Sequence, residues 1–178
     1  MDRLDDMIAL VTGAGGGLGR AMALEFAAEG AQVVALDRDE GTVNETAGLA
    51  KSGAKSIIPV HDDVKKSDDI ASTLAIVQDK YGRLDVLVNN AGVTQRADFR
   101  HIDDDEWQDI MDINVTAAMR FSRDALPLLK VSGKGSIINI SSIMERIHVR
   151  QLSAYSTTKA AIAGMTRAMA VEYAAYNV

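Results

Sequence analysis

Five short runs of β-branched and aliphatic residues recur along this chain of 178 residues, with helical patterns between them. They span residues 8–11, 31–36, 57–60, 84–88 and 136–140. Each run is apolar almost throughout, which is typical of strands covered on both faces, as in a parallel sheet. Because parallel neighbours cannot be joined by hairpins, strict alternation with helices predicts right-handed crossovers and a doubly wound α/β sheet.

The helical patterns repeat every three to four residues. The large apolar residues that predict buried helix faces are Leu18, Met22 and Phe26, then Ile70, Leu74 and Val77, then Trp107, Ile110 and Met111. Gly30 and Gly82 precede strands, where a glycine ends the preceding helix, and Asp103 opens an acidic first turn. The commonest doubly wound nucleotide-binding sheet has six strands in the order 3-2-1-4-5-6. The five strands found here therefore predict a single Rossmann-type domain over residues 1–178, with order 3-2-1-4-5, that lacks one or more C-terminal strands.

Charge and cysteine content exclude several classes of protein. Lys and Arg number 19 against 25 Asp and Glu, and the net charge of −6 repels phosphate backbones, so we expect no nucleic-acid partner. Zero cysteines exclude disulfides and suit a reducing compartment, and three scattered histidines have no metal-ligand spacing, so we expect no metal. The acidic start and the absence of a membrane-length apolar run predict a cytoplasmic protein without a membrane partner.

A glycine-rich turn joins the first strand to the first helix. It lacks the G-x-G-x-x-G and Walker spacings, and instead fits T-G-x-x-x-G-x-G on Thr12, Gly13, Gly17 and Gly19. Glycines let the backbone approach a pyrophosphate, and the first amides of the following helix face the anion. The turn therefore predicts an NAD(P)-binding domain. Its candidate contacts are Gly13, Gly15, Gly17, Leu18 and Gly19.

The second strand ends in Asp37 and Arg38, eighteen residues after Gly19. A carboxylate here can accept both ribose hydroxyls of adenosine and repels a 2′-phosphate. Like charges about 4 Å apart cost about 1 kcal/mol in water and about 4 kcal/mol at an effective dielectric near 20. This favours NAD over NADP, although Arg38 could swing onto a 2′-phosphate.

Two further strands end in polar turns. Asp63 and Val64 follow the third strand, and Asn90, Ala91 and Gly92 follow the fourth. Ligands bind at the carboxyl ends of strands in open α/β sheets, so the first pair could contact adenine and the second group the ribose. Asp, Asn and Gly are also the ordinary residues of turns, and the sequence leaves both interpretations open.

Tyr155 and Lys159 lie thirteen and seventeen residues after Ser142. Spacing of four puts both side chains on one helix face, where an ammonium favours the phenolate and so suits proton transfer. Chance occurrence of Tyr-x-x-x-Lys is the alternative. The order and spacing of the motifs T-G-x-x-x-G-x-G, Asn-Asn-Ala-Gly, Ser142 and Tyr155-x-x-x-Lys159 resemble the classical short-chain dehydrogenase/reductase family, over the whole chain.

That resemblance implies an oxidoreductase with Tyr155 as acid/base, Ser142 as donor to the substrate oxygen, and Lys159 as ligand of the nicotinamide ribose. It also implies that Asn114 holds a water linking Lys159 to solvent, and that Tyr155 and Lys159 contact the cofactor. Hydride would pass between an alcohol or ketone and NAD, without a metal. Relatives are homotetramers or homodimers.

Substrate choice is expected in residues 143–152 and in the segment that follows Val178 in the family. The charges of residues 143–152 favour a sugar, polyol or other small hydroxylated molecule, and the alternative is that they simply face water. Three functions stay open: an active NAD-dependent enzyme, a nucleotide-binding fragment without turnover, and an NADP-dependent enzyme similar to 3-oxoacyl-carrier-protein reductases.

Overall fold

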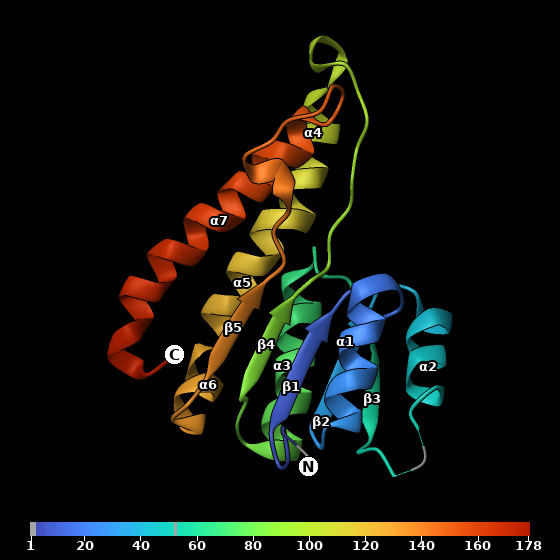
Figure 1. Ribbon diagram of the computed structural model, residues 1–178, viewed down its shortest axis with the longest axis vertical. Helices are drawn as coiled ribbons and strands as arrows, with labels where there is room; N and C mark the ends of the chain where they lie inside the picture. Colours follow the sequence, from blue (N-terminus) through green and yellow to red (C-terminus); the bar gives the residue numbers. More distant parts are fainter. Residues whose placement is uncertain (1–2, 52) are drawn as a thin grey trace.

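The computed structural model describes residues 3–51 and 53–178, and its centre is a five-stranded parallel sheet (Figure 1). The strands are β1 (Ile8–Thr12), β2 (Gln32–Asp37), β3 (Ile57–His61), β4 (Val86–Asn89) and β5 (Ser136–Asn139). Their order is β3-β2-β1-β4-β5, and every pairing is parallel. The predicted doubly wound sheet and its strand order are confirmed.

Helices cover both faces of the sheet. They are α1 (Gly17–Ala28), α2 (Glu40–Gly48), α3 (Ser67–Tyr81), α4 (Asp104–Met111), α5 (Ala117–Asp124), α6 (Leu126–Ser132) and α7 (Ser153–Tyr173). Successive side chains of a strand point to opposite faces. Leu10 packs in the cluster that includes α3, α5 and α6, whereas Val11 packs in the cluster that includes α1 and α2. Burial on both sides explains why the inner strands read as continuous apolar runs.

The first helix buries the predicted face only in part. Leu18 is 67% exposed, whereas Met22 and Phe26 are partly buried and pack against the core. The fully buried residues of α1 are the small ones one position further along, Gly19, Ala23 and Ala27. The period of large side chains thus predicted the helix correctly, but the centre of its buried face is made by small residues.

β5 also differs from the expectation of a strand covered on both faces. Ser136 is exposed and Ile138 is 39% exposed. β5 stands at the end of the strand order, beyond β4, so one side of its backbone has no strand neighbour among the described residues.

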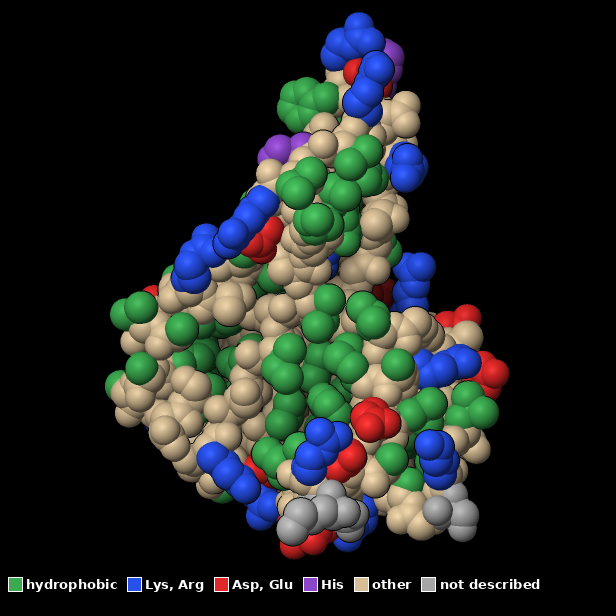
Figure 2. All heavy atoms as spheres, in the orientation of Figure 1, with side chains coloured by type: hydrophobic (Ala, Val, Ile, Leu, Met, Phe, Trp, Pro, Cys, Tyr) green, Lys and Arg blue, Asp and Glu red, His purple; other side chains and the backbone are tan. Residues whose placement is uncertain are grey.

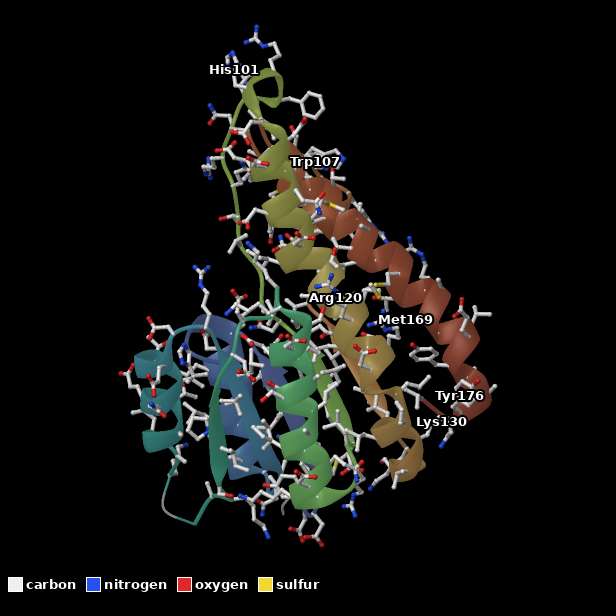
Figure 3. The ribbon with its side chains drawn as sticks, turned by 180° about the vertical axis from the view of Figure 1, so that it is seen from behind. His101, Trp107, Arg120, Lys130, Met169 and Tyr176 are labelled. Carbon is white, nitrogen blue, oxygen red and sulfur yellow. The ribbon has the colours of Figure 1, made fainter. Side chains whose placement is uncertain are left out.

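The predicted long helix near Asp103 is a helical stretch with a change of pitch. The Asp103 side chain accepts a hydrogen bond from the Glu106 amide at 2.7 Å, which caps α4, and a π-helical segment (Asp112–Thr116) joins α4 to α5. Ile110 is buried, whereas Trp107 is only partly so. α4 and the first turns of α7 extend beyond the sheet, and His101 lies at the end of this projection (Figures 1 and 3).

The far end of α7 returns to the body of the molecule. The Lys130 ammonium lies 4.0 Å from the centre of the Tyr176 ring, and the two residues are neighbours in Figure 3. Within residues 3–51 and 53–178, no helix has the length and apolarity needed to cross a bilayer, and no group of metal-binding side chains gathers.

Candidate active site

A cleft of about 600 Å³ opens at the carboxyl ends of the strands. It is lined by residues of the glycine-rich turn, of the segments at the ends of β2, β3, β4 and β5, and of α7. The predicted site residues that line it are Gly13, Leu18, Asp37, Arg38, Asp63, Val64, Asn90, Ala91, Gly92, Ser142, Tyr155 and Lys159. Residues from segments up to 146 positions apart thus meet at one edge of the sheet, as the parallel topology requires.

Three of the predicted glycines support the turn without lining the cleft. A Cβ on Gly19 would lie 2.1 Å from the Gly13 carbonyl oxygen, and one on Gly15 would lie 2.3 Å from the Thr42 hydroxyl. Gly17 has a φ of 51°, which only glycine adopts readily. Gly15 and Gly19 are therefore required by close packing within the protein, and Gly17 by backbone conformation.

The beginning of α1 is open. Gly16 is its N-cap and supplies no side-chain hydrogen bond, whereas Asp39 caps α2 and Asp103 caps α4. The first turn of α1 has no acidic residue, and a Cβ on Gly16 would have no neighbour within 4 Å among the described residues. The first amides of α1 and the positive end of its dipole can therefore face an anion in the cleft.

The Asp37 carboxylate is fixed at the end of β2. One oxygen accepts from the Gly15 amide at 2.8 Å, and the other accepts from the Asp39 amide at 3.1 Å. A carboxylate has about four acceptor positions, so two remain for a ligand. Arg38 lines the same cleft beside it. The carboxylate is thus held in place by backbone donors.

Asn90 and Thr12 tie β4 to the glycine-rich turn. The Asn90 amide group donates to the carbonyl oxygens of Thr12 and Gly13, at 2.9 and 3.1 Å, and the Thr12 hydroxyl oxygen accepts from the amides of Asn90 and Ala91, at 3.0 Å each. The Asn90 side chain therefore holds the turn. At the end of β3, the Asp63 carboxylate accepts a hydrogen bond from the Lys65 amide, which is a contact within the turn itself.

Lys159 is buried next to Tyr155. Its side chain donates to the Ile140 carbonyl oxygen at 2.7 Å and lies 5.6 Å from the centre of the Tyr155 ring. Only 5% of Lys159 is exposed, and this burial lowers the pKa of its ammonium. The Ser142 hydroxyl oxygen accepts from the Met144 amide at 3.2 Å, so its proton can be donated into the cleft.

Ser141 and Glu145 fasten the Ser142 segment to α7. The Ser141 hydroxyl lies 2.9 Å from a Glu145 carboxylate oxygen and 3.1 Å from the Lys159 carbonyl oxygen, both acceptors for its single proton. The other Glu145 oxygen pairs with Arg146 at 3.1 Å. This network positions the loop after β5 against the helix that carries Tyr155.

Asn114 lies outside the cleft lining. Its side chain accepts from the Val93 amide at 2.8 Å and donates to the Val93 carbonyl and to the Thr158 hydroxyl. It is 2% exposed and belongs to the π-helical segment. Its observed contacts fasten the chain after Gly92 to α7, and the water relay to Lys159 stays a prediction.

Several lining residues were not predicted. Ile140 and Ser141 follow β5, Thr94 follows the Asn-Ala-Gly turn, and Ile113 comes from the π-helical segment. The rule that ligands bind beyond the carboxyl ends of strands could have indicated the first two. No local pattern indicates Ile113, because its position depends on the packing of the helical projection.

A parallel sheet in this order, with an uncapped glycine-rich helix start and a fixed carboxylate at one cleft, defines a Rossmann-type nucleotide-binding protein. The family model described as short chain dehydrogenase matches residues 7–178, and the chain belongs to that family.

The proteins that this chain resembles are longer than the chain itself. It is 37% identical over 180 residues to a 3β-hydroxysteroid dehydrogenase of Mediterraneibacter gnavus, and the match covers all of this chain and 64% of that protein. A 3-ketoacyl-(acyl-carrier-protein) reductase from Brucella melitensis, complexed with NADH, has a TM-score of 0.92 at 31% identity, over 98% of this chain and 73% of that one. A metagenomic short-chain oxidoreductase in complex with NADP has a TM-score of 0.92 at 30% identity, over 97% and 79%.

Proposed function

We propose that the protein is an NAD-dependent oxidoreductase that transfers hydride between a secondary alcohol or ketone and nicotinamide. The observation that carries this proposal is the single cleft that contains both the open start of α1 and the Ser142, Tyr155 and Lys159 side chains. Residues 1–178 would form one NAD(P)-binding domain of a longer enzyme, since the chain spans 64% of the length of the similar hydroxysteroid dehydrogenase.

The described residues fit a dinucleotide. The cleft volume lies within the usual range for small-molecule sites of about 300–1,000 Å³. The α1 amides would bind the pyrophosphate, and the free acceptor positions of Asp37 would bind the adenosine ribose. Val64 would contact the adenine, and Gly92 would contact a ribose. The nicotinamide ring would accept or supply the hydride.

The protein's own residues would handle the proton. In alcohol oxidation the Tyr155 phenolate takes the hydroxyl proton, and in reduction the phenol returns it. The Lys159 ammonium lies 5.6 Å from the centre of the Tyr155 ring, and the Ile140 carbonyl oxygen holds it in place. The Ser142 hydroxyl donates to the substrate oxygen, because its own oxygen is already occupied by the Met144 amide.

An NADP-dependent reductase is the second candidate. Arg38 lines the cleft next to Asp37, where a guanidinium could bind a 2′-phosphate. Both NADH and NADP occur in similar solved structures. We favour NAD because the Asp37 carboxylate is fixed by two backbone amides and so cannot turn away from a phosphate without losing them.

We also propose a homodimeric or homotetrameric enzyme of the cytoplasm with a small-molecule substrate and no nucleic-acid partner. The absence of cysteine from the sequence and the net charge of −6 support the compartment and the exclusion of nucleic acid.

Substitution Tyr155→Phe tests the assignment. Loss of the acid/base is expected to lower kcat/KM by about 10²- to 10⁴-fold on any alcohol that the protein oxidises, while the Kd for NAD changes less than about twofold. Turnover is followed by absorbance of reduced nicotinamide across an alcohol panel, and Kd by isothermal titration. Near-wild-type turnover in this variant would refute the proposed mechanism.

A further inference from the structure

Arg20 lies in the first turn of α1, where a positive charge is unfavourable for the helix. The positive end of the helix dipole is there, and a cation next to it is destabilised. The Arg20 side chain is 23% exposed and lies outside the cleft lining, so it is not one of the groups that would touch a bound dinucleotide. Neither helix stability nor direct contact with a ligand therefore accounts for an arginine at this position.

The contacts of Arg20 join the glycine-rich turn to α2. One terminal nitrogen of its guanidinium lies 2.5 Å from the Gly15 carbonyl oxygen, 3.3 Å from the Thr42 carbonyl oxygen and 2.6 Å from a Glu45 carboxylate oxygen. Thr42 and Glu45 belong to α2, which lies beside α1 in Figure 1. Figure 2 shows acidic and basic side chains next to one another over α2, although α2 itself contains no Lys or Arg.

Thr46 extends the same contact to the preceding residue of the turn. Arg20 Nε donates to the Thr46 hydroxyl oxygen at 3.0 Å, and that hydroxyl lies 2.9 Å from the Ala14 carbonyl oxygen. The Thr46 side chain is completely buried. The carbonyl groups of Ala14 and Gly15 are thus both held from the side of α2.

Gly15 connects Arg20 to the proposed adenosine site. Its carbonyl oxygen accepts from Arg20, while its amide donates to one oxygen of the Asp37 carboxylate at 2.8 Å. A Cβ on Gly15 would lie 2.3 Å from the Thr42 hydroxyl oxygen and 2.9 Å from that same Asp37 oxygen, so this residue is packed tightly between α2 and the end of β2. A shift of Gly15 would therefore also move the amide that holds Asp37.

We propose that Arg20 is a positioning residue for cofactor selection. It holds Gly15 so that the Gly15 amide keeps the Asp37 carboxylate where it accepts the adenosine ribose hydroxyls and opposes a 2′-phosphate. Without Arg20, the carboxylate gains freedom to turn away from that phosphate. The inference rests on the proposed function, because it assigns a cause to the proposed preference for NAD over NADP.

The test compares the Kd values of NAD and NADP for the wild type and Arg20→Ala, measured by isothermal titration. We expect the Kd for NAD to rise about tenfold, the lower end of the range for loss of a hydrogen bond to a charged group. The ratio of Kd for NADP over NAD should fall by about threefold or more, because part of the like-charge repulsion between Asp37 and a 2′-phosphate is relieved.

The direction of the change in this ratio separates positioning from electrostatic attraction. Loss of a positive charge weakens the binding of NADP, which carries the additional phosphate, more than the binding of NAD, so attraction alone would raise the ratio. General damage to the site would weaken both cofactors equally. A ratio that rises or stays constant in Arg20→Ala would overturn the proposal.

Arg3→Ala is the matched control. Arg3 also binds a glutamate through two nitrogens, at 3.0 and 2.9 Å, but its partner Glu29 lies at the other end of α1. Both Kd values should stay within about twofold of the wild type in this variant. Glu45→Gln leaves the contact between Arg20 and Gly15 in place and should also keep the ratio. An equal fall of the ratio in either control would contradict the role of Gly15.

Two more variants complete the test. Arg20→Lys retains the charge but lacks the second donor group, so the ratio should fall in the same direction by less, and this variant carries the test if Arg20→Ala does not fold in urea titrations. In an Asp37→Asn background, Arg20→Ala should lower the ratio no further, because both changes act on the same carboxylate. A further fall of equal size would show that Arg20 acts independently of Asp37, which the proposal excludes.

Binding separates this inference from the proposed function. If no alcohol is oxidised but NAD binds and the ratio falls in Arg20→Ala, the inference stands and the oxidoreductase is refuted. If the wild type turns over an alcohol with NAD and the ratio is the same in Arg20→Ala, only the inference fails. A wild type that binds neither nucleotide would refute both.

Discussion

The two walls of the cleft are built in opposite ways. The nucleotide wall, comprising the turn at residues 12–19 and the ends of β2 and β4, is held by hydrogen bonds among backbone groups, Thr12, Asp37 and Asn90. The other wall, which we propose receives the substrate and call the substrate wall, begins at Val93, Thr94, Ser141 and Ser142, which line the cleft. It continues into residues 95–101 and 143–152, where many side chains are exposed. The first wall presents backbone amides and one carboxylate, and the second presents charged and apolar side chains.

The two walls should therefore respond differently to substitution. Changes in the nucleotide wall alter packing or a fixed charge, so they should be felt in stability and in cofactor affinity. Changes in the substrate wall remove individual side-chain contacts, so they should be felt in kcat/KM with little effect on cofactor binding.

Among the variants that compare the two walls, the largest effect is expected from Asp37→Asn. Asparagine keeps an acceptor for the Gly15 amide and removes the negative charge that faces the proposed ribose site. The ratio of Kd for NADP over NAD should fall by about fivefold to several hundredfold, from the energy of like charges about 4 Å apart. Isothermal titration with both cofactors measures the ratio. Glu40→Gln, an exposed charge loss in α2, should leave it unchanged, and the same ratio in Asp37→Asn and wild type would contradict the role of Asp37.

Sequence alone predicted the nucleotide wall better than the substrate wall. The order of the sheet follows from alternation of apolar runs and helices, and the cleft position follows from the topology, so Gly13, Asp37 and Asn90 were found from local patterns. The buried face of α1 was predicted only in part, because Ala23 and Ala27 are its fully buried side chains, Met22 and Phe26 are partly buried, and Leu18 is exposed.

The substrate wall depends on contacts that no local pattern records. Ile113 lines the cleft from the π-helical segment, and the Ala97 amide donates to the Gln151 carbonyl oxygen across 54 residues of sequence. The residues around Tyr155 were predicted from a motif, whereas the contact between residues 93–101 and 146–152 became visible only in the structure.

Two helical glycines, one crowded and one open, test how tightly the nucleotide wall is packed. Alanine at Gly19 would place its Cβ 2.1 Å from the Gly13 carbonyl, whereas a Cβ on Gly164 of α7 would have no described neighbour within 4 Å. Gly19→Ala should lower the free energy of unfolding by about 1–3 kcal/mol through overpacking. Gly164→Ala should raise it by about 0.5–1 kcal/mol, since alanine is the better helix former. Urea denaturation measures both, and destabilisation of equal size would show that the crowding at Gly19 is unimportant.

The smallest effect is expected from Glu145, because it acts through another residue. The Glu145 side chain is only 20% exposed, and its carboxylate accepts a hydrogen bond from the Ser141 hydroxyl. The same hydroxyl lies 3.1 Å from the Lys159 carbonyl oxygen. Glu145→Ala removes an acceptor that holds the Ser142 loop against α7. At about 1 kcal/mol for such a bond, kcat should fall about fivefold, with little change in the Kd for NAD.

Two further variants separate positioning from general damage to the fold. Glu145→Gln retains a side-chain carbonyl as acceptor and should recover most of the kcat. Ser141→Ala should cost a similar amount, and the double variant Ser141→Ala/Glu145→Ala should cost no more than either single one, because both changes remove the same hydrogen bond. Additive losses would mean that Glu145 and Ser141 act independently. In that case the substrate wall would owe its geometry to the Lys159 contacts with Ser141 and Ile140, and the two walls would be more alike in construction than we infer.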